Sequence, residues 1–187
     1  MDHYVDLTLR PDPESAPTHL MAALFAKLHL ALVAQRSEHI GISFPAMQAE
    51  RQWLGECLRL HGAQADLARL MATSWLATMR DYVQPSAVQP VPPDVAHRAV
   101  SRVQAKSSPE RLRRRQMRRH GIDAAQAREC SPDAAGERLN LPYIHIRSHS
   151  TAQPFRLFIQ HGALQKSATP GSFSAYGLSP SATIPWF

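Results

Sequence analysis

The chain has 187 residues, 44% of them hydrophobic, which is enough for one domain of ordinary size or two small ones. No window holds about 18 consecutive apolar residues, so we expect no transmembrane helix. The N-terminus also lacks the basic start and apolar run of a signal peptide. Two cysteines far apart, Cys57 and Cys130, exclude a disulfide framework and a cysteine-based zinc site, and they favour a cytoplasmic location.

Positive charge is concentrated in the second half of the chain. Residues 1–95 contain seven Lys or Arg and ten Asp or Glu, whereas residues 96–187 contain fourteen and five. Of the 21 cations, 18 are Arg, and the planar guanidinium fork is the side chain suited to phosphates and base edges. The charge pattern therefore predicts a nucleic-acid binder with an acidic half and a basic half.

The first half has the element order of a ferredoxin-like domain. Periodicity and caps predict, in chain order, a strand at 3–9, a helix capped by Ser15 or Thr18 and running to about 35, strands at 40–44 and 57–61, a helix at 66–71 and an ambiguous segment at 75–83. Strand, helix, strand, strand, helix, strand is the ferredoxin-like order. We therefore predict an α+β protein whose N-terminal domain, residues 1–93, is ferredoxin-like.

A proline-rich segment separates this domain from the rest. Residues 85–93 (PSAVQPVPP) contain four prolines, so the segment should be stiff and extended. We place the domain border there and predict a smaller second domain over residues 94–187. Its expected elements are an extended segment at 97–104, a helix with Ser108 as N-cap and Pro109 at its first position, a short helix at 123–130, strands at 143–147, 155–160 and 172–176, and a docked Trp186 and Phe187.

The helix after Pro109 carries an arginine arc. Its sequence RLRRRQMRRH at 111–120 puts five arginines within about 140° of the helix circumference: Arg111, Arg114, Arg115, Arg118 and Arg119. These like charges repel one another because acidic partners at i±4 are almost absent. A solvated face is the alternative, but the arc favours binding of nucleic-acid phosphates and at least one base edge. Just upstream, Arg102 and Gln104 are of the types that pair with guanine and adenine edges.

Several other side chains have both a structural and a chemical interpretation. His29 lies within an apolar helix, where it is either a core histidine or a general base at the edge of a cleft. Ser148 and Ser150 lie at a strand end beside His149, without the nucleophile elbow of a hydrolase, so backbone hydrogen bonding is the simpler interpretation. Phe155 and Tyr176 fit either a core or base stacking.

No metal or cofactor site is expected. His145 and His149 have the look of a metal pair, but four residues on a strand span about 13 Å, which is too far to share one ion. We therefore interpret His145 as structural.

Taken together, these residues resemble a known family. Over its whole length the sequence is similar to the CRISPR repeat-RNA processing endoribonuclease of type I-F systems. The resemblance rests on MDHY at 1–4, RPDPE at 10–14, LFAKLH at 24–29, SRVQAKSSPERLRRRQMRRH at 101–120, RSHST at 147–151, FRLFI at 155–159, YGLS at 176–179 and the terminal PWF.

The resemblance implies where RNA is bound. The arginine helix would enter the major groove of the repeat hairpin near its loop, with Arg115 reading a base at the top of the stem. Arg102 and Gln104 would read base pairs at the bottom of the stem, and Phe155 would stack on the terminal base pair. Phosphates would be held by Arg114, Arg118, Arg119 and His120.

The resemblance also implies a metal-independent cut. The 2′-hydroxyl upstream of the scissile phosphate attacks it, leaving a 2′,3′-cyclic phosphate and a 5′-hydroxyl. His29 matches the general base, Ser148 the hydroxyl that holds the ribose, Ser150 a supporting serine, and Tyr176 the aromatic that orients the imidazole.

We therefore expect an endoribonuclease that cleaves precursor CRISPR RNA at the repeat hairpin, stays on its product and joins the other subunits of a surveillance complex, being a monomer when free. One alternative is a catalytically silent hairpin-RNA-binding subunit of the same fold, which differs in whether His29 and Ser148 meet at the scissile phosphate. Another is a DNA-binding architectural protein, which would not depend on the 2′-hydroxyl.

Overall fold

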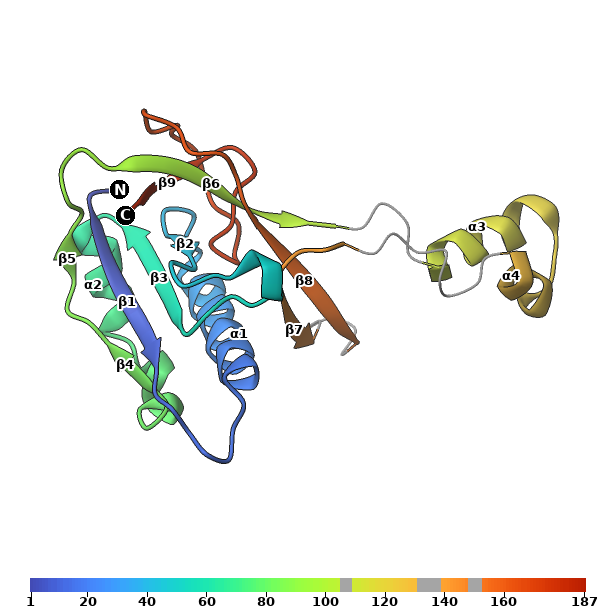
Figure 1. The fold of residues 1–187 in the computed structure, drawn as a ribbon, viewed down its shortest axis with the longest axis horizontal. Coiled ribbons are helices and arrows are strands. Elements are labelled where there is room, and N and C mark those ends of the chain that lie inside the picture. The colour runs from blue at the N-terminus through green and yellow to red at the C-terminus, as the bar shows by residue number, and fades with distance from the viewer. Residues whose placement is uncertain (105–108, 131–138, 148–152) are drawn as a thin grey trace. The chain divides into compact units, whose positions relative to one another are not determined.

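A computed structural model describes residues 1–104, 109–130, 139–147 and 153–187 (Figure 1). The chain is an α+β protein, as predicted, and its contacts divide it into two compact units. The first unit combines residues 1–102 with 141–187, and the second comprises residues 103–140. These units do not coincide with the predicted domains 1–93 and 94–187, because the C-terminal strands share one hydrophobic core with the N-terminal sheet.

The N-terminal sheet has the ferredoxin-like order. Its strands run in the spatial order β2-β3-β1-β4, and every neighbouring pair is antiparallel. Helices α1 and α2 contact each other and both contact β1, so they cover one face of the sheet. The elements are β1 (His3–Leu9), α1 (Pro17–Gln35), β2 (Gly41–Ser43), β3 (Cys57–Gly62), α2 (Gln64–Met71) and β4 (Val83–Pro85). The ambiguous segment forms a 3-10 helix, η2 (Ser74–Met79), and another, η1 (Ala49–Arg51), precedes β3.

The start of α1 differs from the prediction. The N-cap is Ala16, with no side-chain hydrogen bond, so neither Ser15 nor Thr18 caps the helix. Pro17 occupies the first turn, where its fixed φ favours the helix and its missing N–H costs nothing. The backbone N–H of Ser15 instead donates to the Asp12 carboxylate in the preceding turn.

The proline-rich segment is partly incorporated into the N-terminal sheet. A two-residue strand, β5 (Gln89–Pro90), pairs antiparallel with His3 and Tyr4 of β1. The hydroxyl of Tyr4 also donates to the side-chain carbonyl of Gln89 over 2.8 Å. Sequence alone does not predict this pairing. Proline is tolerated in an edge strand when the position of its missing N–H faces solvent, so a short strand with proline has no local sequence pattern that marks it.

The second sheet is built from the C-terminal strands. Its spatial order is β7-β8-β6-β9, from β6 (Ala96–Val103), β7 (Tyr143–Arg147), β8 (Pro154–His161) and β9 (Thr183–Trp186). The prediction did not include β9, which pairs with β6. The predicted strand at 172–176 is wrong: this segment is irregular and ends in a turn. Trp186 packs against the core, as expected, while Phe187 lies over the Arg59 guanidinium with 36% of its surface exposed.

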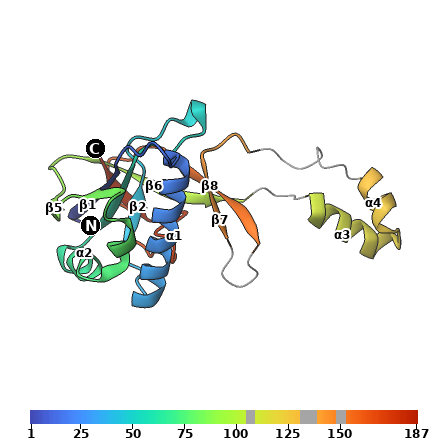
Figure 2. The same cartoon turned by 90° about the horizontal axis from the view of Figure 1, so that it is seen from below.

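The two sheets meet where β2 contacts β9. A Cβ on Gly41 would lie 2.6 Å from a methyl carbon of Ile184 and 2.8 Å from the ring of Phe173. Only glycine therefore allows this approach. Figures 1 and 2 show the hairpin of β7 and β8 beside α1, and α1 contacts β7.

Helix α1 is apolar on nearly all sides. By length and composition it would suffice to cross a membrane, unlike the other helices of the described ranges. Six of its residues are instead buried in the core: Leu20, Met21, Leu24, Phe25, Leu28 and Leu32. A core helix satisfies the same hydropathy test, so the packing explains the composition of α1.

The second unit consists of two helices, α3 (Pro109–His120) and α4 (Ala124–Cys130). They pack on each other, and Ala127 of α4 is fully buried. Gly121 has a positive φ of 63° immediately after α3, which suits the C-terminal end of a helix. Asp123 caps the start of α4 by accepting hydrogen bonds from the backbone N–H groups of Ala125 and Gln126.

Two histidines of the first unit, the fully buried His61 and the half-buried His161, couple folding to pH. Burial, with a smaller effect of Arg59, lowers the pKa of His61 to about 3, and burial next to Arg98 lowers that of His161 to about 4. The Ser43 hydroxyl lies 2.8 Å from Nε2 of His61. Both imidazoles are therefore neutral in the folded protein at pH values where the unfolded chain would protonate them.

We predict that acid destabilises the fold through these residues. Between about pH 6.5 and 4 the unfolded state binds more protons than the folded state, so the free energy of unfolding falls as the pH is lowered, by up to about 1.4 kcal/mol per pH unit for each histidine. His161→Leu should reduce this slope, and His19→Leu, at an exposed position, should not. Urea unfolding at several pH values measures it. Equal slopes for His161→Leu and wild type would contradict the coupling.

Candidate active site and nucleic-acid interface

His29 lies on α1, half-buried, and its ring orientation is fixed by a distant segment of the chain. Its Nδ1 is 2.8 Å from the backbone carbonyl oxygen of Ala175. Because a carbonyl only accepts, Nδ1 carries the hydrogen and donates it. In the neutral imidazole the lone pair is then on Nε2, the tautomer that a general base requires.

An aromatic stack holds the same imidazole in plane. The ring of Tyr176 lies 4.1 Å from that of His29, with 12° between their planes. The ring of Phe25 is also parallel to that of Tyr176, with 5.9 Å between the ring centroids and 6° between the planes. Phe25 and His29 are four residues apart and so share one face of α1. Phe25 was not among the predicted site residues, although its spacing of four residues from His29 was the available signal.

The turn that carries Tyr176 is fastened to β2. The backbone N–H of Ile42 donates to the carbonyl of Gly177 over 3.0 Å, and the N–H of Gly177 donates to Ser174 over 2.8 Å. Gly177 has a φ of 69°, and a Cβ there would lie 2.6 Å from Ile42 Cγ2. Both the backbone conformation and the contact therefore require glycine.

Arg102 and Phe155 also form a pair within the first unit. The guanidinium carbon of Arg102, at the end of β6, lies 5.4 Å from the ring centroid of Phe155 on β8. Arg102 is exposed and Phe155 is half-buried. Gln104 is exposed just beyond β6. An exposed cation over an aromatic ring is one arrangement that contacts a nucleobase and its phosphate together.

The arginine arc lies away from the packed side of α3. Leu112, Arg113 and Gln116 are partly covered, whereas the side chains along the other side are exposed: Arg114, Arg115, Arg118, Arg119 and His120. The first four of these line one shallow hollow of about 310 Å³. Among the described residues no ion pair involves these four guanidinium groups, which leaves them available to an anion.

Three predicted site residues are not characterised by this geometry. Ser148 and Ser150 lie outside the described residues, and so does the side chain of Arg111, although α3 includes its backbone.

The described ranges contain no metal cluster, and the half-buried Cys57 is not a reactive thiol. In them no group of three or more His, Cys, Asp or Glu side chains could hold a metal ion. Burial and the Asp6 carboxylate raise the pKa of Cys57 to about 11, so its thiol stays protonated. His145 is exposed and packs edge-on against Tyr143.

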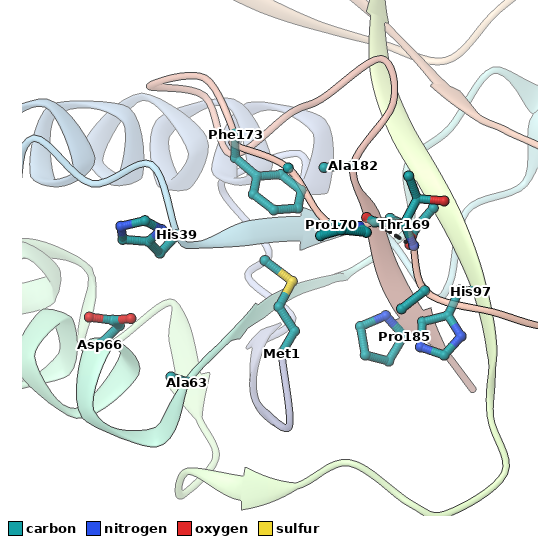
Figure 3. Close-up of a pocket in the computed structure, with 13 residues that line it drawn as sticks. Met1, His39, Ala63, Asp66, His97, Thr169, Pro170, Phe173, Ala182 and Pro185 are labelled. Carbon is teal, nitrogen blue, oxygen red and sulfur yellow. Dashed lines mark hydrogen bonds between the residues drawn. The ribbon is translucent and has the colours of Figure 1, made fainter.

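A separate pocket of about 400 Å³ lies elsewhere in the first unit. Figure 3 shows Met1 projecting into it below Phe173, with His39 and Asp66 on one side and His97 and Pro185 on the other. None of the predicted site residues lines this pocket. The candidate chemistry is therefore at the half-exposed surface of α1.

Fold and site together define an α+β protein with a ferredoxin-like sheet, an oriented histidine and an arginine-rich helix in a second unit. The family described as CRISPR-associated protein (Cas_Csy4) matches residues 4–187. A protein of Pseudomonas aeruginosa (strain UCBPP-PA14) is 52% identical over 187 residues, and one of Escherichia coli (strain UTI89 / UPEC) is 46% identical over 187 residues. Each alignment covers 100% of both chains, and both relatives are named CRISPR-associated endonuclease Cas6/Csy4. The chain belongs to the Cas_Csy4 family of CRISPR-associated proteins.

The attachment of the Tyr176 turn yields a prediction. Gly177→Ala should lower the free energy of unfolding by about 1–3 kcal/mol, because alanine is strained at this φ and overlaps Ile42. It should also change the NMR shifts of the His29 ring protons, since the stacked ring of Tyr176 is displaced.

Gly121→Ala is the matched control. Gly121 has a similar φ of 63°, but nothing lies within 4 Å of a Cβ there. The control variant should show only the cost of the backbone strain and leave the His29 signals in place. Unchanged His29 signals in Gly177→Ala would mean that the turn is positioned by other contacts.

Proposed function

We propose that this chain is an endoribonuclease that cleaves precursor CRISPR RNA at the base of the repeat hairpin. The observation that carries the proposal is the hydrogen bond from His29 Nδ1 to the Ala175 carbonyl, which leaves Nε2 as a proton acceptor. Support comes from the two relatives, which are named CRISPR-associated endonuclease Cas6/Csy4 and align over their whole length.

The reaction needs one proton acceptor and correct alignment. His29 Nε2 takes the proton of the 2′-hydroxyl upstream of the cut, and the 2′-oxygen attacks the adjacent phosphorus. The new bond joins O2′ to phosphorus while the bond to O5′ breaks, and O5′ leaves as a hydroxyl by gaining the one proton that the His29 imidazolium gives up, so that the imidazole returns to its neutral form. The products are a 2′,3′-cyclic phosphate and a 5′-hydroxyl, and the atoms balance without a metal ion or a water molecule.

The other predicted residues have positioning roles in this proposal. Tyr176 keeps the imidazole in plane, which is consistent with its 4.1 Å stack on His29. Ser148 would hold the ribose, and Ser150 would support it. Arg102, Gln104 and Phe155 would contact the bottom of the stem, and the arginine helix would bind it near the loop: Arg111, Arg114, Arg115, Arg118, Arg119 and His120.

We also propose a place for the enzyme after the reaction. After cleavage it would stay bound to the mature guide RNA as a subunit of the type I-F surveillance complex, in the cytoplasm, and it would be a monomer when free. A catalytically silent RNA-binding subunit remains the second candidate, and the orientation of His29 favours the enzyme over it.

Replacing the proposed base tests the chemistry directly. His29→Ala should abolish cleavage and leave affinity for the repeat hairpin nearly unchanged, because the general base takes part in the chemical step and not in binding of the stem. Single-turnover cleavage and hairpin binding are measured on the same preparation. Cleavage at the wild-type rate would overturn the assignment of His29.

The nucleophile is tested on the RNA side. A repeat hairpin with a single 2′-deoxy substitution upstream of the cut should bind normally and resist cleavage. Cleavage of the unmodified RNA should continue in EDTA and give the cyclic phosphate. Activity that is lost in EDTA and restored by magnesium would contradict the metal-independent mechanism.

The arginine helix makes a prediction about selectivity. If Arg115 forks to a guanine edge, Arg115→Ala should cost about 1–3 kcal/mol and relax selectivity at one stem position. Arg115→Lys should rescue binding only in part, because an ammonium group cannot fork to two acceptors. Arg118→Ala should instead weaken binding to all hairpins and lower the salt slope by about one unit. Salt titrations with the cognate hairpin and one with an exchanged base pair measure both effects. If Arg115→Ala and Arg118→Ala each lose equal affinity for both hairpins, the helix contacts phosphates only.

A further inference from the structure

The hairpin of β7 and β8 has a surface that the proposed reaction does not use. Over residues 143–147 and 156–160, buried aliphatic side chains alternate with half-buried or exposed ones. Successive side chains of a strand point to opposite faces, so the second set shares one side of the hairpin. We call this side the outer face; it consists of Tyr143, His145, Arg147, Arg156, Phe158 and Gln160.

The aromatic and cationic side chains of the outer face form one contiguous cluster. In the register of the hairpin, Tyr143 pairs with Phe158 and His145 pairs with Arg156. The ring of Tyr143 lies 5.5 Å from that of Phe158 and 5.0 Å from that of His145. The guanidinium carbon of Arg156 lies 4.8 Å from the centroid of the same tyrosine ring.

The outer face carries positive charge without a compensating acid. The segments YIHIR at 143–147 and PFRLFIQH at 154–161 contain no Asp or Glu. Within the described parts of the chain, no ion pair involves Arg147 or Arg156. Arginine and aromatic side chains side by side fit a ligand with both anionic groups and flat apolar rings, which is the chemistry of nucleic acid.

This surface is distinct from the residues already assigned to RNA. Phe155 immediately precedes Arg156 on β8, so its side chain points to the other side of the sheet. The Arg102 guanidinium lies over Phe155 and therefore belongs to that other side as well. RNA held by Phe155 and Arg102 would leave the outer face unoccupied.

We propose that the outer face binds single-stranded RNA that flanks the repeat hairpin. Tyr143 and Phe158 are half-buried. Aromatic rings on the accessible side of a β-sheet stack on unpaired bases, whereas a duplex buries its base faces inside the stem. The inference rests on the proposed function, since that function supplies an RNA with unpaired flanks on both sides of a hairpin. The carboxylates of an acidic protein would pair with the arginines but would not stack on the aromatic rings, so single-stranded RNA fits the whole cluster better.

The test compares RNAs that differ only in their flanks. Three probes carry a 2′-deoxy substitution at the cut: the bare repeat hairpin, and the hairpin with an unstructured extension of about eight nucleotides at its 5′ or its 3′ end. The variants are Arg156→Gln, which removes one exposed charge, and Phe158→Leu, which keeps an apolar residue in the sheet. Arg80→Gln is the matched control, because Arg80 is also exposed and lies outside this hairpin.

One of the two extensions should tighten wild-type binding by about tenfold. Arg156→Gln and Phe158→Leu should each remove most of that gain and leave binding of the bare hairpin unchanged. Arg156→Gln should also lower the salt slope of the extended probe by about 0.7 of a unit, the value for one phosphate of a single strand. Arg80→Gln should behave like the wild type.

A photocrosslinkable uridine in the extension locates the contact directly. Crosslinks should map to the peptides of β7 or β8 and decrease in Phe158→Leu. If neither extension tightens binding, or if both variants weaken the bare hairpin as much as the extended one, the proposal is wrong and an acidic protein becomes the better partner for the outer face. Failure of the wild type to bind the bare hairpin, or to cleave the same hairpin without the 2′-deoxy substitution, would instead overturn the proposed function, so the two failures are distinguishable.

Discussion

The candidate site depends on one hydrogen bond that joins the beginning of the chain to its end. Nδ1 of His29 reaches the carbonyl of Ala175 across 146 residues of sequence. An imidazole alone on a helix surface would sample several rotamers and both tautomers. The carbonyl selects one tautomer and the stacked ring of Tyr176 selects one ring plane, so the fold supplies the orientation that proton transfer needs.

That hydrogen bond in turn requires close packing at two glycines. Gly41 allows Ile184 and Phe173 to approach β2, and Gly177 allows the turn to lie against Ile42. Both contacts hold the segment 173–178 against the N-terminal sheet, where it can meet α1. A side chain at either position would separate the C-terminal segment from the helix that carries His29. The geometry of the site is therefore a consequence of packing between the two sheets and not of any local motif.

The same dependence explains which features the sequence predicted. Elements with a strong local period were predicted correctly: β1 by its alternation, α1 by its long apolar run, and α3 by its proline start. Their order sufficed for the ferredoxin-like topology. Elements defined by a partner were not predicted, because β5 and β9 contain proline and exist only through their pairing with β1 and β6. For His29 the local pattern favoured a core residue, and only the family resemblance pointed to chemistry. The hydrogen bond of His29 to Ala175 and its stack on Tyr176 are long-range contacts that composition does not encode.

The arginines of the N-terminal sheet and those of α3 differ in whether an acidic side chain compensates their charge. In the N-terminal sheet the cation Arg59 is compensated: its guanidinium forms a bidentate pair with Asp6 at 2.7 and 2.9 Å and lies over two aromatic rings. The four guanidinium groups of Arg114, Arg115, Arg118 and Arg119 have no such acid among the described residues. The charges of Arg59 and Asp6 neutralise each other, so the pair has little net attraction for a further anion. An uncompensated arc gains Coulomb energy and releases counterions only when a polyanion binds. The contrast between the two settings distinguishes arginines that hold the fold together from arginines that are kept for a ligand.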